Sequence, residues 1–179
     1  VLSGIKMQGA MHNVMVLPSM ANVVRGVEAS TGAALWETTL CRPANGGRNI
    51  DMHLINDKWG VLSTGVIDPD TGRVYLVAWC STDGTPQNSM HFIYVLNIAD
   101  GSQAVPPVSL ANVSNGTQRF ASTMRKQRSS LVMTKVDGVK TIFFASGSVM
   151  ETAQGSSGWI IAFDVASNRI TAADRKSVV

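Results

Sequence analysis

Carboxylates, histidines and cysteines are the residues of this chain with the greatest capacity for chemistry. A calcium loop alternates acidic and amide side chains ahead of a glycine, as in D-x-[DN]-x-[DN]-G. No stretch here has that pattern, and Asp68-Pro69-Asp70-Thr71-Gly72 is typical of an ordinary turn. The carboxylates considered as ligands are Asp51, Asp57, Asp68, Asp70, Asp83 and Glu151. We therefore expect no metal site.

His53 and His91 would need converging partners to bind a metal or transfer a proton, and none lies close in the sequence. His53 belongs to a connecting segment, whereas His91 precedes a strand-like run. We expect structural contacts for both. The glycine-rich residues 45–47 and 155–158 lack the strand, loop and helix context of a phosphate-binding cradle. No catalytic residue is predicted.

Cys41 and Cys80 do not have the C-x-x-C spacing of a metal site or of a redox motif. Two cysteines permit a disulfide, but the sequence does not establish whether they meet. We expect two buried free thiols.

The composition describes a globular, strand-prone chain. Its 179 residues are enough for one good core, and 45% are hydrophobic while 15% are charged. The net charge is +3, and the densest basic cluster is Arg119, Arg125, Lys126 and Arg128. A nucleic-acid site would need a larger basic stripe interleaved with aromatic residues. We therefore expect a solvated loop here and no nucleic-acid partner. No apolar run is long enough to span a membrane.

Short apolar runs separated by turn residues recur along the chain, and no helical period is sustained. The run 60–67 is followed at once by 73–79, which predicts a hairpin across the turn at Gly72. The chain is therefore predicted to be all-β. The other strand-like runs are 13–17, 22–27, 91–96, 130–134, 141–145 and 159–163.

These runs repeat with a period near 68 residues. Glu28, Asn97 and Asp164 each follow an apolar strand and stand four residues before a turn position, with separations of 69 and 67 residues. Gly72 and Gly138 are 66 residues apart. Such a unit holds four short strands and one long connection, as a propeller blade does. The repeat predicts that GVEASTGAALWE, residues 26–37, is a hairpin between two outer strands and not a helix.

The same stretch resembles the tryptophan-docking motif of the quinoprotein-type, or PQQ-like, β-propeller family, Ala-x-Asp-x-x-Thr-Gly-x-x-x-Trp. Gly26, Glu28, Thr31, Gly32 and Trp36 stand in its positions, with Gly for Ala and Glu for Asp. Residues 59–68 and 158–164, which include Asp164, resemble an inner strand and a third strand of that family. The resemblance implies that Trp36 packs between blades, and that the docking role is lost or weakened where the other repeats have Val105 and Ala172.

The resemblance implies a truncated fragment of about two to three four-stranded blades, at approximately 1–40, 58–110 and 128–173. Residues 174–179 match the translation of a common sequencing-adapter stretch, so we predict that they derive from one and exclude them from fold reasoning.

The family's alcohol dehydrogenases use a disulfide between adjacent cysteines, a Trp under the quinone, carboxylate and amide calcium ligands and an Asp base. Cys41 and Cys80 are not adjacent, and no C-x-x-C-H haem motif is present. We therefore expect a non-enzymatic scaffold that binds a ligand or a protein, with no evident cofactor. The alternative is a PQQ-dependent oxidoreductase whose PQQ and calcium site lies mainly on other blades. The resemblance also implies a bacterial protein of the periplasm or the cell exterior.

Overall fold

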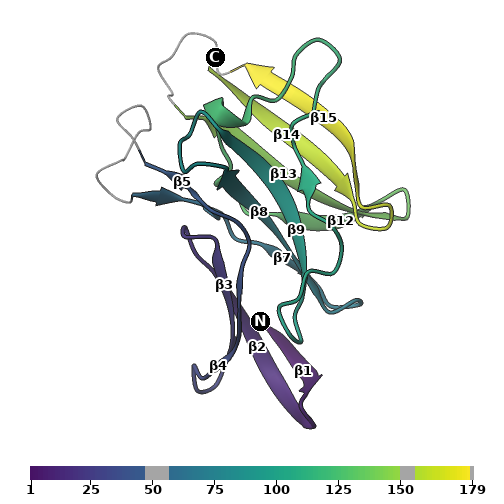
Figure 1. Ribbon diagram of the computed structural model, residues 1–179. Helices are drawn as coiled ribbons and strands as arrows, with labels where there is room; N and C mark the ends of the chain where they lie inside the picture. The colour runs from purple at the N-terminus through teal and green to yellow at the C-terminus, as the bar shows by residue number, and fades with distance from the viewer. Residues whose placement is uncertain (47–56, 150–155, 178–179) are drawn as a thin grey trace.

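Most of the described residues fold into three large antiparallel sheets that follow one another in sequence order (Figure 1). The computed structural model describes residues 1–46, 57–149 and 156–177. We call β1–β4 the first sheet, β7–β10 the second and β11–β15 the third. The first consists of β1 (Leu2–Met7), β2 (Ala10–Pro18), β3 (Val23–Glu28) and β4 (Ala34–Thr39). The second consists of β7 (Val66–Asp68), β8 (Arg73–Ser81), β9 (Ser89–Asn97) and β10 (Val108–Ser109).

The third sheet consists of β11 (Arg125–Lys126), β12 (Val132–Val136), β13 (Val139–Ser148), β14 (Ser157–Asp164) and β15 (Arg169–Ser177). β11 and β12 pair with successive parts of β13, on the edge opposite β14, so together they occupy the place of one strand. A small two-stranded ladder joins β5 (Ala44–Asn45) to β6 (Lys58–Trp59), and a 3-10 turn, η1 (Ser122–Met124), precedes β11.

Residues 26–37 form a hairpin, as the repeat predicts. β3 pairs antiparallel with β4, with Gly26 opposite Trp36. At the turn, the Gly32 N–H donates to the Glu28 carbonyl oxygen at 2.8 Å, and Gly32 has a φ of +73°, which glycine adopts without steric cost. Thr31 is exposed, and its hydroxyl oxygen accepts from the Ala33 N–H at 3.2 Å.

The hairpin across Gly72 is also present, but the predicted strand 60–67 is mostly wrong. Only Val66 and Ile67 belong to β7, which pairs with β8 from Val66 opposite Tyr75 onwards. The backbone at Gly60 is engaged elsewhere: its N–H donates to the Met20 carbonyl at 2.8 Å, and its carbonyl accepts from the Trp79 N–H at 3.2 Å. These bonds tie the segment to the first sheet and to the end of β8.

Alternation of side chains explains how the three sheets stack. A strand presents successive residues to opposite faces, so a strand with a single covered face alternates between buried and exposed. In β8, residues 74–81 are all buried, because the first sheet covers one face and the third covers the other. Val14, Leu76 and Leu96 belong to the core between the first two sheets. Tyr75, Ile93 and Ile161 belong to the larger core between the second and third. The fold is a partial β-propeller of four-stranded antiparallel blades.

Residues 174–177 continue β15, with Asp174 opposite Ile160 and Ser177 opposite Ser157 on β14. This pairing describes the backbone and does not test the origin of the segment, so adapter derivation stays a prediction.

The expectation of two free thiols is wrong, because Cys41 and Cys80 form a disulfide. Cys41 lies just after β4 and Cys80 lies in β8, with their Cα atoms 5.7 Å apart. An isolated bridge also pairs Pro43 with Cys80. The second sheet brings β8 alongside the end of the first sheet, and this places the two cysteines in contact although 39 residues separate them.

Candidate functional site

Trp36, the aromatic residue of the predicted docking motif, lies between the first and second sheets. Its indole N–H donates to the Ile98 carbonyl oxygen at 2.8 Å. The ring lies against two glycines, because a Cβ added to Gly26 would be 2.2 Å from it and one added to Gly101 would be 2.4 Å from it. The neighbouring Thr38 hydroxyl donates to the Gly101 carbonyl at 2.7 Å. Gly in place of the motif's Ala at position 26 is therefore what lets the indole approach the β3 backbone.

The two acidic motif positions make local structural contacts, Glu28 with the neighbouring strand β2 and Asp164 with its own turn. Glu28 accepts from the Asn13 N–H at 3.3 Å and lies 2.9 Å from His12 Nδ1, and the hydrogen bond with His12 is the main cause of its lowered pKa. Asp164 accepts from the Ala166 N–H at 2.8 Å. Hydrogen bonds from Ser167 and then from Ala166 lower the pKa of Asp164. The motif residues are therefore distributed over two sheets and do not converge on one site.

Among the described residues, no group of three or more His, Cys, Asp or Glu side chains could hold a metal ion. Asp68 is buried and is bonded to Lys140 Nζ at 2.7 Å, which ties the second sheet to the third. Burial raises the pKa of Asp68, but hydrogen bonds from Lys140 and Thr71 outweigh it and the pKa is lowered. Asp51, His53 and Glu151, considered from the sequence, lie outside the described residues.

His91 is a core residue. It is 1% exposed, its ring stacks on Trp79 with centroids 5.0 Å apart, and Phe120 meets it edge-on at 5.8 Å. Neither ring nitrogen has a hydrogen-bond partner among the described residues. Burial therefore lowers the pKa of the imidazole to about 3.

The basic cluster is not wholly a solvated loop, because Arg125 and Lys126 are buried in β11. The Arg125 guanidinium donates from Nη1 to the Ser157 carbonyl at 2.6 Å and to Ser148 Oγ at 3.0 Å. The Lys126 ammonium lies 5.6 Å from the centre of the Trp59 ring. Hydrogen bonds to neighbouring strands and an aromatic ring replace the water that the sequence pattern suggested.

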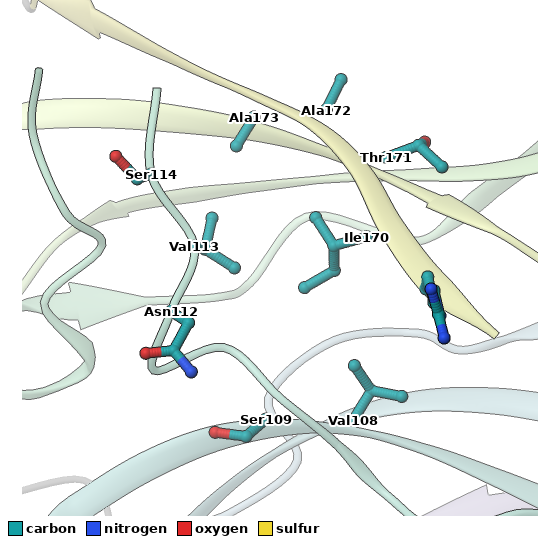
Figure 2. A pocket seen from close by; sticks show the side chains of 10 residues that line it. Val108, Ser109, Asn112, Val113, Ser114, Ile170, Thr171, Ala172 and Ala173 are labelled. Atoms are coloured by element: carbon teal, nitrogen blue, oxygen red, sulfur yellow. The ribbon is translucent and has the colours of Figure 1, made fainter. Parts of the chain in front are cut away.

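A groove of about 580 Å³ lies between the outermost strands of the second and third sheets (Figure 2). Residues 108–109 and 112–114 form one wall, and residues 169–173 of β15 form the other. Figure 2 shows the side chains of Val113 and Ile170 directed toward one another across it. Val113 is buried, and Val108, Ile170 and Ala173 pack against the core between the second and third sheets. These inward-directed apolar side chains of the two walls, Val108, Val113 and Ile170, form what we call the floor of the groove, and the core holds them in place.

The absence of an indole distinguishes this rim from the one between the first two sheets. There Trp36, on the outermost strand of the first sheet, covers Gly101. The second sheet has Val105 at the same repeat position, and Val105 packs into the core. This repeat difference is the one sequence signal for the groove. A further hollow of about 630 Å³ borders the Cys41–Cys80 disulfide. We favour the groove as the candidate site because unpaired strand edges border it.

No protein-family model and no curated protein sequence matches the chain. Among solved structures, the crystal structure of BamB from Moraxella catarrhalis is similar, with a TM-score of 0.50 and 15% sequence identity. The match covers 89% of this chain and 37% of the BamB chain, so the chain spans little more than a third of that length. At this identity the likeness shows the β-propeller fold alone. Within the described residues, no helix is long and apolar enough to cross a membrane.

Proposed function

We propose that the chain acts as a non-enzymatic binding scaffold, and that a ligand or protein partner occupies the groove between β10 and β15. The groove itself is the observation that carries the proposal. It is within the size range of sites that hold small ligands or short peptide segments. Its apolar floor is fixed to the largest core, so a partner meets a preformed surface and little ordering is required on binding.

Nuclear magnetic resonance tests this proposal directly. The ¹⁵N-labelled chain is titrated with a defined set of small molecules and short peptides, and the shifted backbone amides are mapped. We expect the largest shifts at Ser109, Ser114 and Thr171, on the two walls of the groove. Shifts confined to residues around Cys41 and Cys80, or no shifts with any member of the set, would contradict the proposal.

The alternative, a quinoprotein oxidoreductase, makes a different prediction. Calcium and PQQ are added to the protein, and dye-linked dehydrogenase activity is followed with alcohol substrates. We propose that neither addition produces activity, because the sequence has no adjacent pair of cysteines and no calcium-loop pattern. PQQ-dependent activity would overturn the scaffold proposal.

We also propose a periplasmic or extracellular location. The Cys41–Cys80 disulfide supports it, because disulfides persist in oxidising compartments and are rare in the cytosol. Thiol alkylation followed by mass spectrometry of the protein taken from its native compartment tests this. Two alkylated cysteines without prior reduction would contradict it.

A further inference from the structure

Each wall of the groove includes the edge strand of a sheet, β10 on one side and β15 on the other. β10 is the last strand of the second sheet and pairs only with β9, and β15 is the last strand of the third sheet and pairs only with β14 among the described residues. An edge strand presents a row of N–H and C=O groups that can pair with a further strand. In β15, residues 169–173 present this edge to an apolar groove.

We propose that the groove takes an extended peptide of a protein partner, which adds to the edge of β15 as a further strand. This inference rests on the proposed function and specifies its partner. Strand addition gains affinity from main-chain hydrogen bonds and specificity from pockets for alternate side chains. The free edge of β15 supplies the main-chain hydrogen bonds. The apolar floor at Val108, Val113 and Ile170 supplies the specificity for side chains.

The dimensions of the groove define the peptide. Five consecutive residues of β15 line it, which at ~3.3 Å per residue corresponds to about 17 Å of strand. A peptide of five or so residues in extended form matches this length. Because side chains alternate between faces, every second residue of the peptide meets the floor. Val113 and Ile170, directed toward one another across the groove, select apolar side chains there.

The charge of the groove determines which side chain is favoured at one end of the peptide. Arg169 is exposed, and among the described residues that line the groove it is the one charged residue. A carboxylate at the corresponding end of the peptide pairs with it. A second copy of the chain fits less well, because residues 169–173 of β15 have Arg169 as their one charged residue and offer no carboxylate to pair with it.

The experiment uses three synthetic peptides with capped ends. The first peptide is acetyl-Asp-Val-Ser-Val-Ser-Val-amide, with the carboxylate near its N-terminus. The second has the reversed sequence, with the carboxylate near its C-terminus. Both are needed because a peptide can pair with β15 in either direction. In the third peptide Lys replaces Asp. Calorimetric titration is expected to show that one Asp peptide binds about two- to fivefold more tightly than the Lys peptide, as for an exposed ion pair. Arg169→Glu is expected to reverse this preference. The matched control Lys6→Glu, on the first sheet, is expected to leave it unchanged.

Methylation of the peptide nitrogens tests strand pairing itself. Each N-methyl group removes one donor, so methylation at alternate positions is expected to weaken binding by about tenfold, while the positions between are tolerated. Slower hydrogen exchange in residues 169–173 is expected when the peptide is bound. Equal tolerance at every position would refute strand addition and leave the groove as a binding site.

The remaining outcomes are equally decisive. If small molecules shift the groove amides but no peptide binds, the peptide inference is wrong and the proposed function stands. If neither binds, both are wrong. Sedimentation of the chain alone identifies a competing occupant. Concentration-dependent dimers that protect residues 169–173 from exchange would show that a second copy occupies the edge, and would overturn the inference.

Discussion

Replacement of His91 by Phe should flatten the dependence of stability on pH. The imidazole is enclosed by Trp79 and Phe120, and its nitrogens have no partner in the part of the chain that the structure describes. Burial lowers its pKa to about 3 from the ordinary 6.5. The folded state therefore holds the ring neutral, while the unfolded chain binds a proton below its ordinary pKa. Stability from this group is complete above about pH 6.5 and is lost as the pH falls toward 3.

The expected size follows from the gap between the two pKa values. One pKa unit corresponds to about 1.4 kcal/mol, so at about pH 4.5, roughly two units below the ordinary pKa, His91 costs about 3 kcal/mol. His91→Phe removes this cost and keeps an aromatic ring against Trp79. It also removes two unpartnered polar atoms, so its stability at about pH 7 should equal or exceed that of the wild type.

Urea unfolding followed by tryptophan fluorescence measures the difference. The free energy of unfolding of each protein is determined at about pH 7 and about pH 4.5, and the wild type should lose about 3 kcal/mol more than the variant. Carboxylates contribute equally to both proteins and cancel. His91→Leu should show the same slope as His91→Phe at a lower overall stability. Parallel losses in the wild type and both variants would refute the assignment of a neutral buried imidazole.

Three further changes test the packing of the first sheet, each by chemical unfolding. Trp36→Phe should cost about 1 kcal/mol, because the ring is kept but the bond to the second sheet is lost; a neutral result would contradict that contact. Gly26→Ala should cost about 1–3 kcal/mol because its Cβ meets the indole, whereas Gly147→Ala, with no atom of the described residues within 4 Å of the added Cβ, should be near neutral. Removing both Cys41 and Cys80 as Ala should cost about 4 kcal/mol, as expected for a loop of 39 residues; equal stability in reducing and oxidising buffer would argue against the disulfide.

The sequence predicts the strands and the stacked sheets because both follow from local periodicity and turn chemistry. Gly32 and Gly72 mark turns by their backbone freedom, and this signal lies within a few residues of each hairpin. The repeat at Glu28, Asn97 and Asp164 extends the signal to whole sheets. These features are encoded in short stretches, so they can be read without a structure.

The remaining features depend on contacts between sheets, which local patterns do not encode. Cys41 and Cys80 meet only because β8 runs beside the end of the first sheet. Arg125 is buried because β11 pairs with the end of β13, and its guanidinium reaches past β13 to the Ser157 carbonyl on β14. The groove depends on the spacing of two outer strands, for which Val105 is an indirect sign. The strands and turns within each sheet can therefore be predicted from the sequence, whereas the contacts between sheets cannot.

The hydrogen bond from Trp36 to Ile98 also determines when the first sheet can complete its packing during synthesis. The acceptor follows the donor by 62 residues. A ribosome that adds about 5–20 residues per second needs roughly 3–12 s to make that stretch. Throughout this interval the strands of the first sheet exist, but the indole has neither its carbonyl acceptor nor the glycine that it covers. The first sheet therefore completes its packing only as part of a nascent segment that reaches at least to Gly101.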